Sequence, residues 1–279
     1  GLDINFTRYY NSLAGLDSPI GHSWNHSYNV YINADVKNGT KTGNLTVVLG
    51  DGRRITYAPN AAGGGYAPVA KGVYERLTKN TDGTYTLTQK DQVKYNFNTD
   101  NKLSTIVDRN GNTVTLVYTG NNLTQISDTV GRTVTLTYEN LAGLDRITSI
   151  KGPVRPAVTY GYDSYGYGNL TSVTDARGYT THYTYTSGHD DKHLLEKITD
   201  PRGHDRVRNF YGKANGTEDP HGYFVVRQLD ANTEGTRYVY DVANRVTSVT
   251  GPDLKVTKHY YDDQYRFTKE VDPKGYVLE

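Results

Sequence analysis

The stretch Leu103–Tyr118, LSTIVDRNGNTVTLVY, decides the fold because the next segment of the chain repeats it. Residues Leu123–Tyr138 read LTQISDTVGRTVTLTY. With the first leucine as position 0, both copies carry Leu at 0, Ile at +3, Asp at +5, Gly at +8 and Tyr at +15. Two β-rich runs flank a D-x-x-G turn, so each copy predicts one β-hairpin. A residue that recurs in every copy is more typical of a scaffold than of a single active site.

The second run of each copy alternates between apolar residues and threonine. Val114, Leu116 and Tyr118 occupy +11, +13 and +15, and threonines stand at 113 and 115. This alternation predicts a half-buried antiparallel strand. In the first run the Leu and Ile are three residues apart, so we expect the Leu at a strand edge or at a bulge. A lone hairpin is marginal in water, so the units should pair laterally into one continuous sheet, with no appreciable helix.

The pattern continues to the end of the chain. Further matches, complete or partial, begin at Ile147, Leu170, Leu195, Val225, Val246 and Phe267. The unit that begins at Leu195 has Phe210 in place of the tyrosine, and an insertion around residues 212–222 follows it. We interpret the recurring residues as structural; in the three complete copies they are Asp108, Gly111, Tyr118, Asp128, Gly131, Tyr138, Asp175, Gly178 and Tyr185.

The segment before the repeats has a different character. Gly21 and Trp24, the only tryptophan, suggest a tight bend with one large anchor. Residues 45–57 predict a hairpin, and the composition of residues 58–72 predicts a loop. A further hairpin begins near residue 73. We therefore expect an N-terminal β lead-in at residues 1–72, and about eight hairpin units at 73–279 with the last one truncated.

Composition excludes several classes of protein. The chain has 279 residues with a formal net charge of +1, which gives no electrostatic reason to expect nucleic acid. The 26 tyrosines favour strands over disorder. There are no cysteines, so neither disulfides nor cysteine metal ligands are possible. No apolar run approaches the roughly 18 residues of a membrane span, so we expect no such span.

No catalytic or metal-binding pattern stands out. Calcium at Asp108–Asn112 is conceivable, but oxygen ligands do not alternate up to a terminal Glu, and turn capping explains the Asp column better. The eight histidines are scattered, among them His189 and His193, without metal-ligand spacing. The glycines at 63–65 precede no predicted helix, which argues against phosphate binding. We expect neither an enzyme nor a cofactor.

Tyr-Asp pairs end several units and carry a family resemblance. They are Tyr162-Asp163, Tyr240-Asp241 and Tyr261-Asp262, and YDVANRV and YDDQYRF resemble the Y-D-x-x-G-R-L signature of YD repeats. The chain resembles the Rhs/YD-repeat family, which includes bacterial Rhs and wall-associated toxins, the shell of insecticidal toxin complexes, and teneurins. The opening FTRYYNS and GHSW are similar to the family's lead-in, with His-Ser before the Trp in place of x-G.

The resemblance implies a fold and a function. The fold would be all-β, with successive antiparallel hairpins forming a continuous, curved, spiralling sheet, an open section of a β-shell. Such a shell encloses a C-terminal toxin or other cargo of a secreted or cell-surface bacterial protein. The partners would be neighbouring YD repeats of the parent chain and that enclosed C-terminal domain. Family shells end in a D-P-x-G segment near an aspartyl self-cleavage site. Asp200-Pro-Arg-Gly203 and Asp272-Pro-Lys-Gly275 have this form, although each also fits a type I turn.

Two alternative functions remain open from the sequence. A carbohydrate-binding adhesin would use exposed tyrosines as a platform, and the candidates are Tyr160, Tyr162, Tyr183, Tyr185, Tyr238 and Tyr240. Cross-strand packing within the sheet is the simpler explanation of these rings. An autoproteolytic enzyme would cleave near Asp200 or Asp272. Because the sequence begins without Met, we also expect a segment of a longer polypeptide, whose unpaired edge strand allows weak edge-to-edge self-association.

Overall fold

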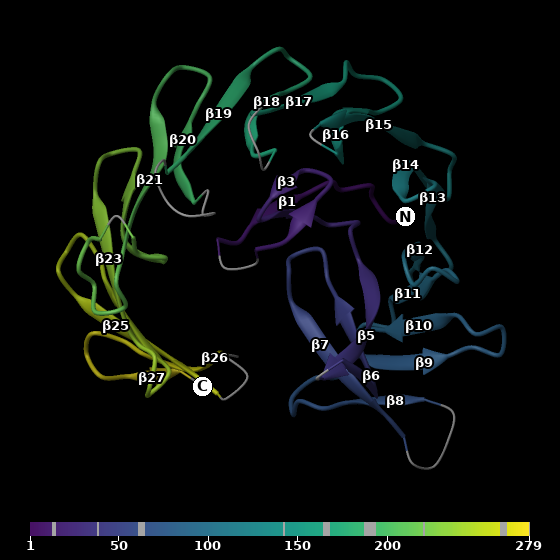
Figure 1. Cartoon of the computed structure of the whole chain (residues 1–279), viewed down its shortest axis with the longest axis horizontal. Helices are drawn as coiled ribbons and strands as arrows, with labels where there is room; N and C mark the ends of the chain where they lie inside the picture. The colour runs from purple at the N-terminus through teal and green to yellow at the C-terminus, as the bar shows by residue number, and fades with distance from the viewer. Residues whose placement is uncertain are drawn as a thin grey trace. The chain divides into compact units, whose positions relative to one another are not determined.

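The structure, a computed structural model, is built of β-strands. It describes residues 1–12, 15–37, 39–60, 65–141, 143–163, 168–186, 194–219, 221–262 and 267–278, with Lys37 as backbone alone. No helix occurs in this part of the chain, which confirms the predicted all-β fold. The chain divides into two compact units (Figure 1). Unit 1 is Gly1–Leu170 with Asp175–Arg177, and unit 2 is Thr171–Thr174 with Gly178–Glu279. A separate lead-in at residues 1–72 stays a prediction.

The strands of unit 1 are β1 (Arg8–Tyr10), β2 (Asp17–Ser18), β3 (Gly21–His22), β4 (Trp24–His26), β5 (Tyr31–Lys37), β6 (Thr40–Val48), β7 (Arg54–Pro59), β8 (Tyr66–Pro68), β9 (Arg76–Lys79), β10 (Tyr85–Thr88), β11 (Lys94–Phe97), β12 (Leu103–Val107), β13 (Thr113–Thr119), β14 (Asn122–Asp128), β15 (Thr133–Leu141), β16 (Leu144–Lys151) and β17 (Val158–Tyr162).

The strands that follow are β18 (Leu170–Thr174), β19 (Thr180–Tyr185), β20 (Leu195–Thr199), β21 (Asp205–Gly212), β22 (Phe224–Asp230), β23 (Gly235–Asp241), β24 (Val246–Thr250), β25 (Val256–Tyr261), β26 (Phe267–Val271) and β27 (Val277–Leu278).

Strand pairing follows the chain. From β5 onward, the ladders of the described residues join strands that are neighbours in sequence, and every one is antiparallel. The sheet is therefore a succession of hairpins and not a closed barrel. The hairpins predicted at residues 45–57 and near residue 73 are present as β6–β7 and β9–β10. The predicted loop at 58–72 needs correction, because β8 lies within it and pairs with β7. Its Pro68 lies at the end of β8, where proline costs little ladder bonding.

Strand β12 lies beside the start of β5 and is hydrogen-bonded to it. Tyr31 and Lys102 form an isolated bridge, the Ile32 amide donates to the Asn101 carbonyl, and the Leu103 amide donates to the Val30 carbonyl. These bonds connect the start of β5 with the start of β12. The side chains enclosed by β5 to β12 are apolar and buried; they include Val30, Ile32, Val47, Ile55, Tyr57, Leu77, Leu87, Phe97 and Leu103. One apolar core thus organises this part of unit 1.

A β-bulge recurs at one position of the repeat. Between β13 and β14, Val117 pairs with Gln125 but Tyr118 pairs with Leu123, so Thr124 is the extra residue. The same shift at +1 occurs at Ser104, Thr148, Glu196, Val226 and Thr268. An extra residue lets positions 0 and +3 face the same side, although strand side chains normally alternate. Leu123 and Ile126 are accordingly both buried. The bulge expected from the Leu–Ile spacing is present.

Pairing is shorter within a repeat than between repeats. Inside the first two copies, β12–β13 and β14–β15 each pair over three residues, Thr105–Val107 with Thr113–Thr115 and Gln125–Ser127 with Thr133–Thr135. The ladder from β13 to β14 of the next copy has six pairs, and that from β15 to β16 has seven. In these two copies each unit is therefore held by its neighbour more than by its own hairpin, whereas β24 and β25 of a later unit pair over five residues and β25 and β26 over four.

The D-x-x-G turns share one hydrogen-bond pattern. The Gly111 amide donates to the Asp108 carbonyl at 3.1 Å, and the Asp108 amide donates to the Asn112 carbonyl at 3.0 Å. Asp108 Oδ1 accepts the amides of Asn110 and Asn112. Gly111 has φ of +81°, a conformation that costs L-residues about 1–2 kcal/mol. The same carboxylate bonds recur at Asp128, Asp200, Asp230 and Asp272, and Asp175 accepts the Arg177 amide.

We predict that Gly111→Ala lowers the free energy of unfolding by about 1 kcal/mol. A Cβ at Gly111 would contact nothing within 4 Å, so only the backbone conformation opposes it. Gly152→Ala is the matched control, because Gly152 also has open space but lacks a positive φ. Urea unfolding followed by circular dichroism measures both variants. Equal stability of the two alanine variants would contradict this explanation of the turn.

Candidate functional site

The feature repeated most faithfully is a hydrogen bond from a tyrosine hydroxyl to a backbone carbonyl. Tyr118 Oη donates to the Leu103 carbonyl at 2.9 Å, so position +15 bonds to position 0 of its own unit. Register pairs within the hairpin begin only at Thr105, and Leu103 lies outside them. The same bond joins Tyr138 to Leu123, Tyr162 to Ile147, and Tyr240 to Val225. We call this interaction the tyrosine clamp.

Each tyrosine of the clamp connects three strands. The backbone of Tyr118 in β13 pairs with Leu123 in β14, while its hydroxyl reaches back to β12. Burial raises the pKa of Tyr118, Tyr138 and Tyr162, and it raises that of Tyr240 to about 12. The hydroxyls therefore stay protonated and able to donate at ordinary pH. The sequence predicted these tyrosines as buried rungs, but it gave no sign of the partner that each hydroxyl has.

Two repeats differ from the predicted pattern, one in the position of its tyrosine and one in its bulge. Phe210 was expected at the tyrosine position, but it is Tyr211 whose hydroxyl donates to the Leu195 carbonyl at 2.8 Å. An extra residue in β21 opposite Ile198 and Thr199 moves the register by one, which explains the displacement. In the unit that begins at Val246, β23 and β24 pair without a register shift, so the bulge is missing there.

The proposed glycan platform does not match the structure. Tyr160 and Tyr183 are each only 7% exposed, so their faces are not available for stacking on a sugar. Tyr162 and Tyr240 are half-buried and serve in the clamp. The remaining two, Tyr185 and Tyr238, are also half-buried, and Tyr238 stacks on Tyr240. The alternation that suggested a ladder of rings places these side chains in the packed face of the sheet.

Strands β1–β4, which we call the lead-in strands, pack against β16 and β17 within unit 1 (Figure 1). Arg146 is 1% exposed, and its guanidinium donates to the Ser18 carbonyl at 2.6 Å and contacts Asp17 at 3.3 Å. The Ile147 amide donates to the Pro19 carbonyl at 2.8 Å. An arginine whose charge is paired and hydrogen-bonded in this way tolerates burial. Sequence reasoning missed Arg146, because nothing in the repeat pattern marks that position.

The Gly21 bend fits closely where the lead-in meets the sheet. Gly21 has φ of +119°, and a Cβ there would lie 3.1 Å from the Leu170 amide nitrogen and 3.3 Å from the Gly168 carbonyl oxygen. Both the backbone conformation and the close approach therefore require glycine at this position. Trp24, the predicted anchor, is 5% exposed and lies against Tyr10 with ring centroids 5.3 Å apart.

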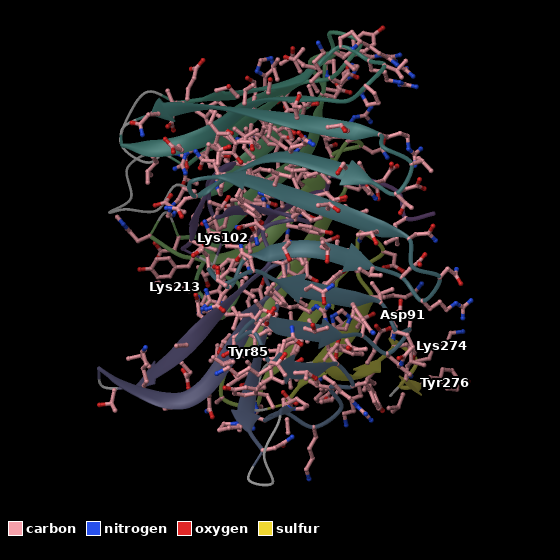
Figure 2. The ribbon with its side chains drawn as sticks, turned by 90° about the vertical axis from the view of Figure 1, so that its right-hand side faces the viewer. Tyr85, Asp91, Lys102, Lys213, Lys274 and Tyr276 are labelled. Carbon is pink, nitrogen blue, oxygen red and sulfur yellow. The ribbon has the colours of Figure 1, made fainter. Side chains whose placement is uncertain are left out.

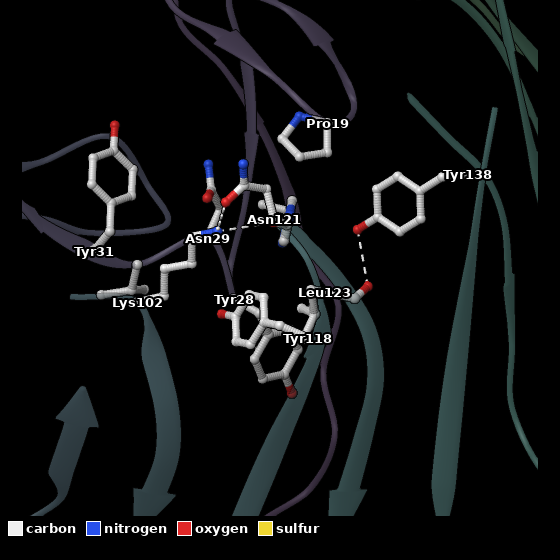
Figure 3. Close-up of a pocket in the computed structure, with 11 residues that line it drawn as sticks. Pro19, Tyr28, Asn29, Tyr31, Lys102, Tyr118, Asn121, Leu123 and Tyr138 are labelled. Carbon is white, nitrogen blue, oxygen red and sulfur yellow. Dashed lines mark hydrogen bonds between the residues drawn. The ribbon is translucent and has the colours of Figure 1, made fainter. Parts of the chain in front are cut away.

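A small cavity of about 80 Å³ lies between the lead-in and the sheet of unit 1 (Figure 3). Lys102 Nζ donates to the carbonyl and side-chain oxygens of Asn121 and lies 5.4 Å from the Tyr118 ring centroid. The wall is completed by Pro19, His26, Tyr28, Asn29, Val30, Tyr31, Leu123 and Tyr138. It contains one cation, and no carboxylate lines it.

The D-P-x-G aspartates lie in ordinary hairpin turns. Asp200 Oδ1 accepts the amides of Arg202 and His204, and Asp272 Oδ1 accepts those of Lys274 and Tyr276. The bond from the His204 amide holds the pKa of Asp200 below its usual range, with Arg206 adding to the effect. Both carboxylates are thus engaged in turn capping.

Within the described ranges, no three His, Asp or Glu side chains gather where a metal ion could bind. His189, His193 and Gly63–Gly64 lie outside the described residues. No helix of membrane-spanning length and apolarity occurs in the part that the structure describes.

Comparison with known families gives two matches. Residues 1–57 match the model of a domain of unknown function, DUF6531, and residues 165–205 match the RHS Repeat model. A search of curated proteins found no significant match.

Solved structures give distant matches. The chain is similar to the crystal structure of TcdB2-TccC3-TEV, with 12% identity and a TM-score of 0.32 over 82% of this chain. It is also similar to the Photorhabdus luminescens Tc holotoxin pore with a variant TccC3, with 14% identity and a TM-score of 0.27 over 88% of this chain. The matched region spans 15% of each of those chains.

We predict that Tyr240→Phe lowers the free energy of unfolding by about 1–2 kcal/mol, because the Val225 carbonyl loses its donor while the ring stays. Tyr276→Phe is the control within unit 2. The Tyr276 side chain is 72% exposed and is labelled in Figure 2, so we expect no change in the free energy of unfolding for this variant. Denaturant titration measures both. An unchanged Tyr240→Phe variant would remove the clamp as a source of stability.

The clamp also predicts an alkaline dependence. The pKa of Tyr240 is near 10 in the unfolded chain and about 12 in the folded one. A raised folded pKa means that its contribution is complete below pH 10 and is lost as pH rises from 10 to 12. The stability difference between the wild type and Tyr240→Phe should therefore narrow over that range. Unfolding free energies at pH 8, 10 and 11 test this, and a constant difference would be the contrary result.

Proposed function

We propose that this chain, which belongs to the Rhs/YD-repeat family, is a non-catalytic section of a shell wall that encloses another part of its polypeptide. The observation that carries the proposal is the tyrosine clamp. It recurs in several repeats, and in each of them the tyrosine hydroxyl is hydrogen-bonded to a backbone carbonyl. Residues used in this way build a continuous surface rather than one reactive centre.

The pairing pattern supports a wall. In the first two copies the ladders between units are longer than those inside a unit, so each of these hairpins depends on the next one for much of its pairing. Such a sheet becomes longer as repeats are added, and its function depends on the extended surface that the repeats form together. Extra residues within the insertion are compatible with such a wall, because the Tyr240 amide of β23 donates to the Ala214 carbonyl.

The cargo and the location follow from the family. The enclosed part is a C-terminal toxin or another domain, and the parent is a secreted or cell-surface bacterial protein. Residues 1–72 are the lead-in to the shell, and residues 73–279 are its YD-repeat wall. A chain without cysteines suits passage through a secretion system in an unfolded state. The glycan-binding alternative has no observation in its favour, because its tyrosines are buried or half-buried.

Limited proteolysis of the full-length parent polypeptide tests enclosure. Its non-repeat segment should resist protease in the wild type, although an unfolded or loosely folded cargo would be cleaved quickly if it were free. A variant with Tyr118→Phe and Tyr138→Phe loses two clamps of the wall, and we expect the protected segment to become cleavable. Tyr276→Phe is the control that should keep protection.

Mass spectrometry of the fragments identifies the cleaved segment. Cleavage of the non-repeat segment in the wild type, at the rate of the same segment expressed alone, would contradict enclosure.

A further inference from the structure

The lead-in contains a buried histidine with an unmet hydrogen bond. His26 ends β4, is 2% exposed, and stacks on Phe6 with ring centroids 4.7 Å apart. Its Nδ1 has no hydrogen-bond partner in the structure. A neutral imidazole tolerates one unpaired nitrogen at moderate cost. An imidazolium carries a proton on both nitrogens, so its Nδ1–H would be a buried charged donor without an acceptor.

The charged groups around His26 do not favour protonation. Its register partner in β1 is Arg8, whose guanidinium lies 5.6 Å from the Tyr160 ring centroid, and the cavity that His26 lines contains Lys102. Both are cations. The other titratable residues of that cavity are Tyr28, Tyr31, Tyr118 and Tyr138, which are neutral below pH 8.

The carboxylates of the adjoining segments have other partners. Asp3 contacts Arg132, Asp17 contacts His22 and Arg146, and Asp51 pairs with Arg53 beside Gly50. None of them lines the cavity. Burial is the cause that lowers the pKa of His26 to about 3. Burial and the unpartnered Nδ1 therefore both favour the neutral ring while the lead-in is docked.

The segment that carries His26 is ordered by docking, and β4 is buried along its whole length. β1 and β4 form a two-stranded sheet of three register pairs, Arg8–His26, Tyr9–Asn25 and Tyr10–Trp24. It is joined to the rest of unit 1 by side chains such as Arg8 on Tyr160 and by the bonds near Arg146. A two-stranded ribbon is marginal by itself, so its order depends on docking.

We propose that His26 is an acid-sensitive latch: its protonation releases the lead-in strands β1 and β4 from the sheet of unit 1. The folded pKa lies below the free value of about 6.5, so the contribution of His26 is complete above pH 6.5 and is lost as pH falls toward 3. The release equilibrium grows tenfold for each pH step below 6.5, which is about 100-fold at pH 4.5. Release would open the interior of unit 1 in an acidic compartment.

Hydrogen exchange of the whole chain at pH 6.5, 5.5 and 4.5 tests the latch, with rates divided by the intrinsic rate at each pH. Protection of amides in β1 and β4 should fall up to about 100-fold by pH 4.5. Protection in β13 and β15 should stay constant. Emission of Trp24, the only tryptophan, should shift to longer wavelength over the same range, since it lies in β4 and is buried.

Two variants separate His26 from other acid effects. His26→Phe keeps an aromatic ring against Phe6 and should remove the pH dependence of β1 and β4. His22→Gln should retain it, because this variant leaves His26 unchanged and alters a side chain that contacts Asp17.

Constant protection of β1 and β4 down to pH 4.5 would overturn the proposal. So would an equal loss of protection in the sheet strands, or a pH response that survives in His26→Phe. If His26→Phe does not fold, the wild type and His22→Gln still test the proposal, because constant protection of β1 and β4 in either one would overturn it.

Discussion

The sheet depends on one repeated hydrogen bond. The hydroxyl of a tyrosine donates it to the backbone carbonyl at the first position of the same repeat. A bulge at +1 brings positions 0 and +3 to one face, which gives the first strand two adjacent apolar contacts with the core. It also interrupts the ladder beside position 0. A buried carbonyl without a donor costs about 1–3 kcal/mol. The tyrosine hydroxyl supplies the missing donor and so offsets the cost of the bulge. Phenylalanine could not supply this donor at Tyr118, Tyr138, Tyr162, Tyr211 or Tyr240.

The clamp also explains how repeats cooperate. Tyr118 and Tyr138 each pair through the backbone with position 0 of the next unit, while the side chain bonds to position 0 of its own unit. Insertions between units are accommodated where the register can shift. Tyr211 takes the place expected for Phe210 because an extra residue in β21 moves the hydroxyl by one position. The requirement is for a hydroxyl at a point in space and not for a residue at a fixed spacing.

The lead-in follows a different logic. Its contacts with β16 and β17 use buried polar groups, with Arg146 bonded to Ser18 and contacting Asp17, and Arg8 beside Tyr160. Such contacts specify one docked position because a displaced charge would be left unpaired. They also make docking sensitive to charge, in contrast with the threonine and apolar faces of the repeats. Unit 1 thus combines repeats with threonine and apolar faces and a docked segment that contains the buried His26.

The sequence alone determined the all-β class, the hairpin unit, the turn at each D-x-x-G and the bulge after the first leucine. Those features are local: alternation, turn chemistry and a spacing of three leave few backbone solutions. Only the tertiary structure decided what the tyrosine hydroxyls bond to, that β8 adds a strand inside a glycine-rich segment, and that Arg146 and His26 are buried beside the lead-in. These depend on which distant segments meet, and Ser18 and Arg146 are 128 residues apart. The repeat of LSTIVDRNGNTVTLVY encodes its own hairpin, but the carbonyl of Leu103 becomes a hydrogen-bond site only when the folded strands bring Tyr118 beside it.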